Sequence, residues 1–138
     1  RVLDLSPSVR SRLTFENDEN SYSLRDLLPL SERTGCPVVW DSHHHTFNTG
    51  DLSLAEAYRL SRETWRDSGV KPLQHLSNSE PGTESASVQQ RRKHSWLIHS
   101  VPAPQLEGLM ADEVDVDVEA KGKNVAIFKM VREMKIPL

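Results

Sequence analysis

The sequence predicts an α/β protein built on a parallel sheet, because short apolar segments alternate with amphipathic segments four times along 138 residues. The apolar segments have strand-like lengths and cover residues 13–15, 37–40, 70–76 and 114–119. Consecutive parallel strands joined by helices form right-handed crossovers, so four (β/α) units are expected. Four units make half of an eight-fold barrel or a small doubly wound open sheet, and the periodicity leaves both open.

In the first unit, residues 13–15 form a short buried strand that stops at the polar run beginning with Glu16. Ser23, with Asp26 three residues later, has the pattern of a capping box, so a helix should begin there. Gly35 is the expected stop. Pro29 lies deep enough in this segment to kink or shorten the helix.

In the second unit, residues 37–40 form a strand that ends in a loop of Asp41, Ser42 and three histidines. Ser53 and Glu56 form a second capping box, and the helix that follows should end at Gly69. The third strand, residues 70–76, is the weakest of the four because Lys, Pro and Gln interrupt its apolar pattern.

Residues 77–90 are rich in Ser, Glu, Gly and Pro, which predicts a long surface loop above the functional face. A helix is expected near residues 105–110, and the alternation of residues 114–119 predicts the fourth strand. Residues 124–134 supply a closing helix. We therefore expect residues 1–138 to form one domain.

The composition is that of an ordinary soluble protein, with 36% hydrophobic and 27% charged residues. No apolar run approaches the roughly 20 residues that span a bilayer, and the first residues lack a signal-peptide pattern, so an intracellular protein is expected.

Cys36 is the single cysteine, which excludes an intramolecular disulfide and a Cys-based zinc site. The net charge of −3 disfavours a broad nucleic-acid surface, and residues 91–93 are interpreted as solvated charge.

Ionisable side chains occur at every predicted strand end, where loops of parallel α/β folds meet on one face. Glu16, Asp41, His75 and Glu119 occupy these ends, and His44 and His94 lie where they can join them. Buried together, such groups favour a divalent cation that offsets their desolvation. Carboxylates mixed with imidazoles suit Mn²⁺, Zn²⁺ or Fe²⁺ better than Ca²⁺, which prefers oxygen ligands alone. Mn²⁺ is the expected ion, with Zn²⁺ or Mg²⁺ as alternatives, and a two-metal site is suited to phosphodiester hydrolysis.

Three stretches together resemble the UV damage endonucleases: residues 13–30, residues 35–45 and His75-Leu76-Ser77. His94 with Ile98, and residues 118–123, extend the likeness. The resemblance implies the C-terminal half of a TIM barrel. It also implies a metal-dependent DNA-repair endonuclease that nicks damaged double-stranded DNA on the 5′ side of ultraviolet photoproducts.

The resemblance also implies roles for individual residues. Glu16 would bridge two metals and act in catalysis, while Asp41, His75 and Glu119 would complete the shell of the second ion. His44 and His94 would hold a third ion. Lys121 would contact the phosphate and take part in catalysis, and Ser77 would contact DNA.

Two positions depart from the family pattern as the resemblance gives it: Leu73 stands where a lysine is expected, and Ser42 where a larger side chain is common. The family's first four strands are absent. We therefore expect this chain to be inactive alone and to need either a complementary N-terminal half barrel or self-association. A divalent-metal sugar isomerase or epimerase of the same fold, and a non-catalytic half-barrel binding module, are the alternative functions.

Overall fold

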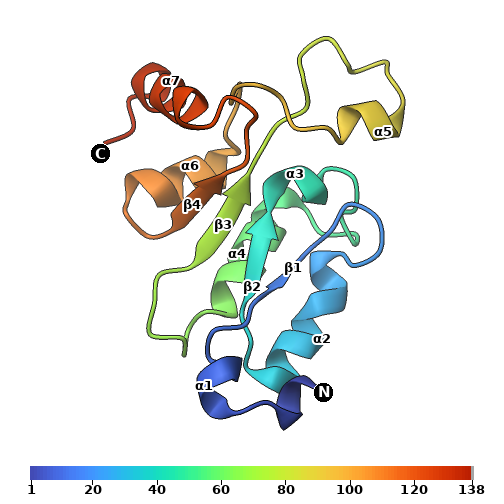
Figure 1. Cartoon of the computed structure of the whole chain (residues 1–138), viewed down its shortest axis with the longest axis vertical. Coiled ribbons are helices and arrows are strands. Elements are labelled where there is room, and N and C mark those ends of the chain that lie inside the picture. Colours follow the sequence, from blue (N-terminus) through green and yellow to red (C-terminus); the bar gives the residue numbers. More distant parts are fainter. Residues whose placement is uncertain (138) are drawn as a thin grey trace.

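The computed structural model describes residues 1–137 and contains one sheet of four parallel strands in the order β1-β2-β3-β4 (Figure 1). The strands are β1 (Phe15–Glu16), β2 (Val38–Asp41), β3 (Leu73–Leu76) and β4 (Asp115–Val118). Each strand pairs with the next along the chain, as in a barrel, and the order does not reverse as it does in a doubly wound sheet. The predicted fold class, four (β/α) units, is confirmed.

Four longer helices follow the strands: α2 (Leu24–Thr34), α4 (Leu54–Glu63), α6 (Ala103–Met110) and α7 (Asn124–Met134). Four short helical turns complete the structure: η1 (Val2–Asp4), α1 (Pro7–Arg10), α3 (Ser42–His45) and α5 (Val88–Arg91). Among residues 1–137, no helix combines the length and the apolar character needed to cross a membrane.

Both predicted capping boxes are present. Ser23 and Asp26 exchange side-chain and backbone hydrogen bonds at the start of α2, and Ser53 and Glu56 do the same at the start of α4. Gly35 ends α2 with a φ of 70°, a conformation that glycine adopts without a steric cost. Two capping boxes and one glycine therefore set three of the four ends of these two helices.

Several predicted boundaries were wrong. The helix α2 runs without a break through Pro29, because this residue is exposed and the carbonyl that it leaves without a donor can bind water. The helix α4 ends at Glu63 rather than near Gly69, and β3 begins only at Leu73, after Pro72. Residues 42–45 form the one-turn helix α3 instead of a loop.

The core lies on one face of the sheet, between the strands and the helices. One apolar cluster joins Val38 and Trp40 of β2 to residues of α2 and α4. A second cluster joins Leu76 of β3 to Ala126 and Met130 of α7. Alternation along each strand then directs the remaining side chains to the opposite face, which is the interior of a barrel.

The register of the sheet arranges that inner face in layers. Glu16 pairs with Val39, whereas Asp41 pairs with His75, which in turn pairs with Asp117. Glu119 follows directly after β4. Glu16 therefore starts one layer below Asp41 and His75, and Glu119 starts one layer above them.

Gln74 of β3 is 1% exposed, and neither the nitrogen nor the oxygen of its side-chain amide has a hydrogen-bond partner. An unpaired buried amide costs about 1–3 kcal/mol. We predict that Gln74→Met raises the free energy of unfolding by about 1 kcal/mol in urea denaturation. The matched control is Gln105→Met, which removes a hydrogen bond to the His75 carbonyl and should lower it. Equal destabilisation by both changes would show that Gln74 is satisfied by a buried water.

Candidate metal centre

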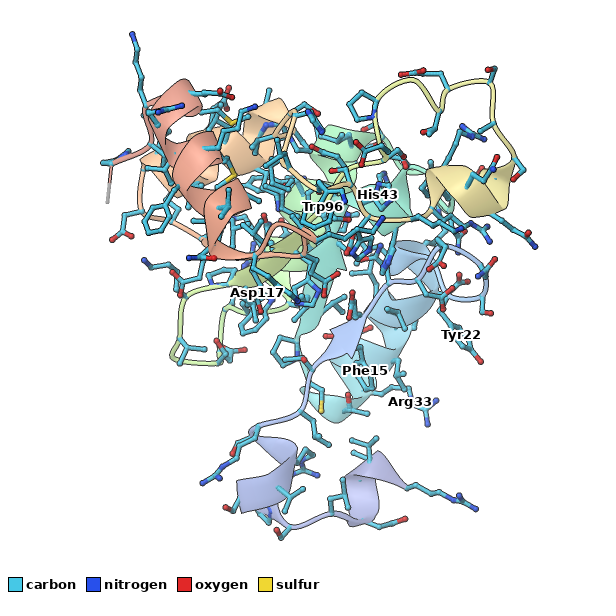
Figure 2. All side chains as sticks on the ribbon, turned by 45° about the horizontal axis from the view of Figure 1, so that its top comes forward. Phe15, Tyr22, Arg33, His43, Trp96 and Asp117 are labelled. Atoms are coloured by element: carbon cyan, nitrogen blue, oxygen red, sulfur yellow. The ribbon has the colours of Figure 1, made fainter. Side chains whose placement is uncertain are left out.

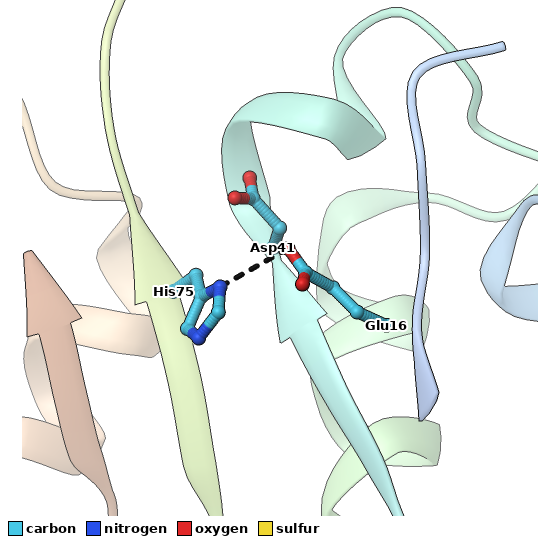
Figure 3. A group of neighbouring side chains, drawn as sticks. All are labelled: Glu16, Asp41 and His75. Carbon is cyan, nitrogen blue, oxygen red and sulfur yellow. Dashed lines mark hydrogen bonds and ion pairs between the residues drawn. The ribbon is translucent and has the colours of Figure 1, made fainter. Parts of the chain in front are cut away.

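Three side chains meet where β1, β2 and β3 end. Glu16, Asp41 and His75 each offer one ligand atom, and these atoms all lie within 4.8 Å of one another. Figure 3 shows Glu16 and His75 directed toward each other from neighbouring strands, with Asp41 on the strand between them. His75 Nδ1 lies 3.0 Å from Glu16 Oε1, which is hydrogen-bond distance. The long side chain of Glu16 thus spans the layer that separates it from His75.

Glu119 approaches the same group from the opposite side. Its Oε1 lies 3.7 Å from His75 Nδ1, and its Oε2 lies 3.8 Å from His94 Nε2. His44, one turn after β2, places Nδ1 at 3.5 Å from Glu16 Oε1 and at 3.6 Å from Asp41 Oδ2. The structure therefore brings together all six residues that the sequence predicted as metal ligands.

Asp41 is held more firmly than the other carboxylates of the group. Its Oδ1 accepts hydrogen bonds from the backbone N–H groups of His43 (2.7 Å) and His44 (2.8 Å), which makes Asp41 the N-cap of α3. The Asn17 side chain accepts from Asp41 N (2.9 Å) and donates to Asp41 O (3.0 Å). The orientation of Asp41 is thus fixed by bonds that do not use Oδ2.

The Oδ2 atom of Asp41 has no hydrogen-bond partner, although the side chain is 0% exposed. A buried carboxylate oxygen without a donor is costly, because its lost hydration is not replaced. The imidazole Nδ1 of His44 lies 3.6 Å from this atom, and the Asp41 carboxylate belongs to the same group of ligand atoms as Glu16 and His75. A divalent cation would supply the missing partner, so the donor set fits a metal ion.

The Glu16–His75 hydrogen bond favours the charged form of both groups. It raises the pKa of His75, and burial opposes the rise. It also lowers the pKa of Glu16, again against burial. In the metal-free chain the pair stabilises the fold most between the ordinary pKa values of a glutamate and a histidine. That contribution is lost as pH rises through the raised pKa of His75 or falls through the lowered pKa of Glu16.

The three consecutive histidines have three different environments. His44 joins the candidate ligands, whereas His43 is buried, with Nε2 3.4 Å from the Arg92 carbonyl oxygen and its ring edge-on to Phe47. His45 is buried beside Trp40 in the core. Burial lowers the pKa of both His43 and His45. Successive residues of a helix point in different directions, so the one-turn helix α3 directs the three side chains to different surroundings. The predicted loop did not specify these directions.

Two supporting residues near the centre were not predicted. Asn17 is fully buried and brackets the backbone of Asp41, while Glu19 places Oε2 3.7 Å from His44 Nε2. Both lie in the polar run that begins where β1 ends, within the Glu16–Glu19 stretch that carried the family resemblance. That stretch was the available signal, since asparagine and glutamate in a polar loop have no other distinguishing pattern.

The two predicted DNA contacts lie in different settings. Lys121 is exposed and lines a pocket of about 380 Å³ together with His94, Glu119 and Lys123. Ser77 is buried and lines a separate pocket of about 720 Å³ beneath the loop that follows β3. Both assignments remain predictions.

The interpretation of residues 91–93 as solvated charge was wrong for two of the three residues. Arg91 and Arg92 are only partly exposed, and both guanidinium groups lie over the ring of Phe47, at 5.6 and 5.7 Å. Arg92 also donates to the side chain of Asn20 and to the carbonyl of Glu19 (2.8 Å). These contacts join the loop after β3 to the loop after β1.

Comparison with known proteins identifies the family. The sequence model described as "UV-endonuclease UvdE" matches residues 1–137. The chain belongs to this family. It is 36% identical over 137 residues to the UV-damage endonuclease of Schizosaccharomyces pombe, and 40% identical over 131 residues to the UV DNA damage endonuclease of Deinococcus radiodurans. The crystal structure of SacUVDE superposes with a TM-score of 0.72 at 30% identity, which agrees with the half-barrel fold.

The matches cover nearly all of this chain but less than half of the length of each relative. They include 96% of the chain and 22% of the Schizosaccharomyces pombe protein, and 91% of the chain and 39% of the Deinococcus radiodurans protein. For SacUVDE the shares are 99% and 45%. The chain therefore corresponds to less than half of each of these relatives, and this portion contains the candidate metal centre.

A titration tests the central hydrogen bond. In the metal-free chain, NMR should give His75 a pKa above the ordinary histidine value of about 6.5, because ionised Glu16 binds the imidazolium. Glu16→Gln should lower that pKa, since the amide carries no charge. The control Glu63→Gln, which changes a carboxylate outside the cluster, should leave it unchanged. A His75 pKa that is the same in all three proteins would rule out the bond in solution.

Proposed function

We propose that this chain is the metal-binding half of a DNA-repair endonuclease that cleaves the backbone on the 5′ side of ultraviolet photoproducts. Family membership supports the reaction class, and the names of the relatives support damaged DNA as the substrate. The observation that carries the proposal is the buried, unpartnered Oδ2 of Asp41 at the centre of a carboxylate and imidazole cluster.

The residues have distinct roles in this proposal. Glu16, Asp41, His75 and Glu119 would hold the principal ions, His44 and His94 would extend the site, and Mn²⁺ is the cation expected from the mixed oxygen and nitrogen donors. When bound, such ions would activate water and stabilise the charge that develops on the phosphate. Lys121, beside Glu119, would bind a phosphate oxygen of the strand. Asn17 holds Asp41 in place, and in the metal-free chain the Glu16–His75 hydrogen bond keeps both side chains oriented.

The two alternatives have different standing. Nothing in the described residues favours a sugar isomerase, and the family is named for DNA cleavage. A non-catalytic binding module agrees with the limited share of the relatives that the chain covers. That alternative predicts a folded chain with no tight metal binding, so metal binding separates it from the proposal.

Calorimetric titration with Mn²⁺ tests the site. We predict that Asp41→Asn and Glu16→Ala each weaken binding of at least one ion by about 100-fold or more, because each removes a charged ligand. The control Asp67→Asn makes the same chemical change as Asp41→Asn at the opposite end of the sheet, where Asp67 lines a pocket with Leu13 and Pro37. It should leave the affinity unchanged. Circular dichroism confirms folding, and a folded wild-type chain that binds no Mn²⁺ would contradict the proposal for this chain.

A chimera tests the reaction. This chain would replace the matching residues of the Deinococcus radiodurans relative, and the product would be incubated with irradiated and untreated supercoiled plasmid. We predict Mn²⁺-dependent nicking of irradiated plasmid, and a loss of about 10³-fold or more when Glu16→Ala is added, because Glu16 would be a ligand of the ions that activate water. A chimera that folds and binds Mn²⁺ but never nicks DNA would refute the catalytic assignment.

A further inference from the structure

Trp96 stands apart from the other tryptophans. Trp40 and Trp65 are 0% and 7% exposed. Trp96, which lies in the segment between β3 and α6 (Figure 2), is 62% exposed. Its neighbours in sequence, Ser95 and Leu97, are buried and partly buried. The Trp96 ring therefore projects outward from a segment that is otherwise packed.

The backbone around Trp96 is fixed on both sides. Ser95 N donates to the Asn78 carbonyl (2.8 Å), and Trp96 N donates to a carboxylate oxygen of Glu80 (3.1 Å). From the other side, Lys121 N donates to the Ser95 carbonyl (3.0 Å), and Gly122 N donates to the Trp96 carbonyl (2.9 Å). The exposed ring is thus mounted on an ordered support, which lowers the entropy lost when it binds a partner.

The same hydrogen bonds place Trp96 beside the candidate phosphate-binding residues. A Cβ atom at position 122 would lie 2.5 Å from the Trp96 carbonyl oxygen, so only glycine allows the turn to approach this closely. That turn carries Lys121 and Lys123, both exposed, which line a pocket with the candidate ligands His94 and Glu119. The backbone of the residue that carries this exposed aromatic ring therefore adjoins the turn that carries the two cations, and that turn lines a pocket with two candidate metal ligands.

We propose that Trp96 stacks on an unpaired nucleobase of the DNA strand whose phosphate lies at Lys121 and Lys123. This inference rests on the proposed action on DNA and adds a substrate-binding residue. Aromatic rings beside basic side chains bind single-stranded nucleic acid by combining base stacking with phosphate contacts. An intact duplex covers the faces of its bases, whereas a damaged base is cheaper to unstack. Trp96 therefore favours DNA with an exposed base over intact duplex.

Fluorescence provides the test, because Trp96 is the only exposed tryptophan among residues 1–137. The probes are a single-stranded oligodeoxynucleotide of about 16 nucleotides, within the range of known site sizes, and the matching intact duplex, both with Mg²⁺. We predict that the single strand quenches the tryptophan emission. Trp96→Ala should weaken single-strand binding about 5- to 150-fold, which corresponds to the roughly 1–3 kcal/mol of stacking one base. Duplex binding should change much less.

Two further variants separate stacking from charge. Trp96→Phe keeps an aromatic face and should retain most of the single-strand affinity, whereas Lys121→Ala should weaken binding to both probes and reduce its salt dependence. If the wild type and Trp96→Ala bind the single strand equally, stacking is refuted while the endonuclease proposal stands. Absence of quenching by either DNA also refutes it. If the chimera alone, without DNA, shields Trp96 from acrylamide, the ring contacts protein instead, which again refutes stacking.

Discussion

The structure of the candidate site depends on the burial of the Asp41 carboxylate at the end of β2. One of its oxygens accepts two backbone N–H groups, and its backbone is bracketed by the side chain of Asn17. These bonds fix the start of α3, and with it the direction of His44. The other oxygen has no hydrogen-bond donor, and the carboxylate lies in one group with Glu16 and His75. These hydrogen bonds orient the carboxylate through its first oxygen and leave the second oxygen available to a ligand.

Much of this arrangement follows from the sequence, because strand ends and helix caps have local signals. Parallel strands end on one edge, so an ionisable residue at each end predicts a cluster without any knowledge of distances. The capping boxes were equally local. The one-turn helix α3 was not predicted, since its cap is Asp41 itself, a residue that the sequence marks only as a ligand. The role of Asn17 was also invisible, because it consists of two bonds to a backbone 24 residues away.

Tertiary contacts also give different surroundings to residues that look alike in sequence. Arg91, Arg92 and Lys93 belong to one basic run, but the two arginines lie over Phe47, while Lys93 is exposed. The outer strands β1 and β4 each pair along one edge within the described residues, which agrees with a chain that matches 45% of SacUVDE. An open sheet edge and an exposed inner face are what half of a barrel leaves uncovered.

The stagger of the sheet gives the choice between aspartate and glutamate a geometric meaning. Asp41 lies in the same layer as His75, and its short side chain is sufficient. Glu16 begins one layer below and Glu119 one layer above, and each needs an additional methylene to reach the same imidazole. The length of each acidic side chain thus matches the offset of its strand from His75. In a barrel of unknown structure, the pattern of short and long acidic residues at successive strand ends would report how steeply the strands are sheared, before any coordinates exist.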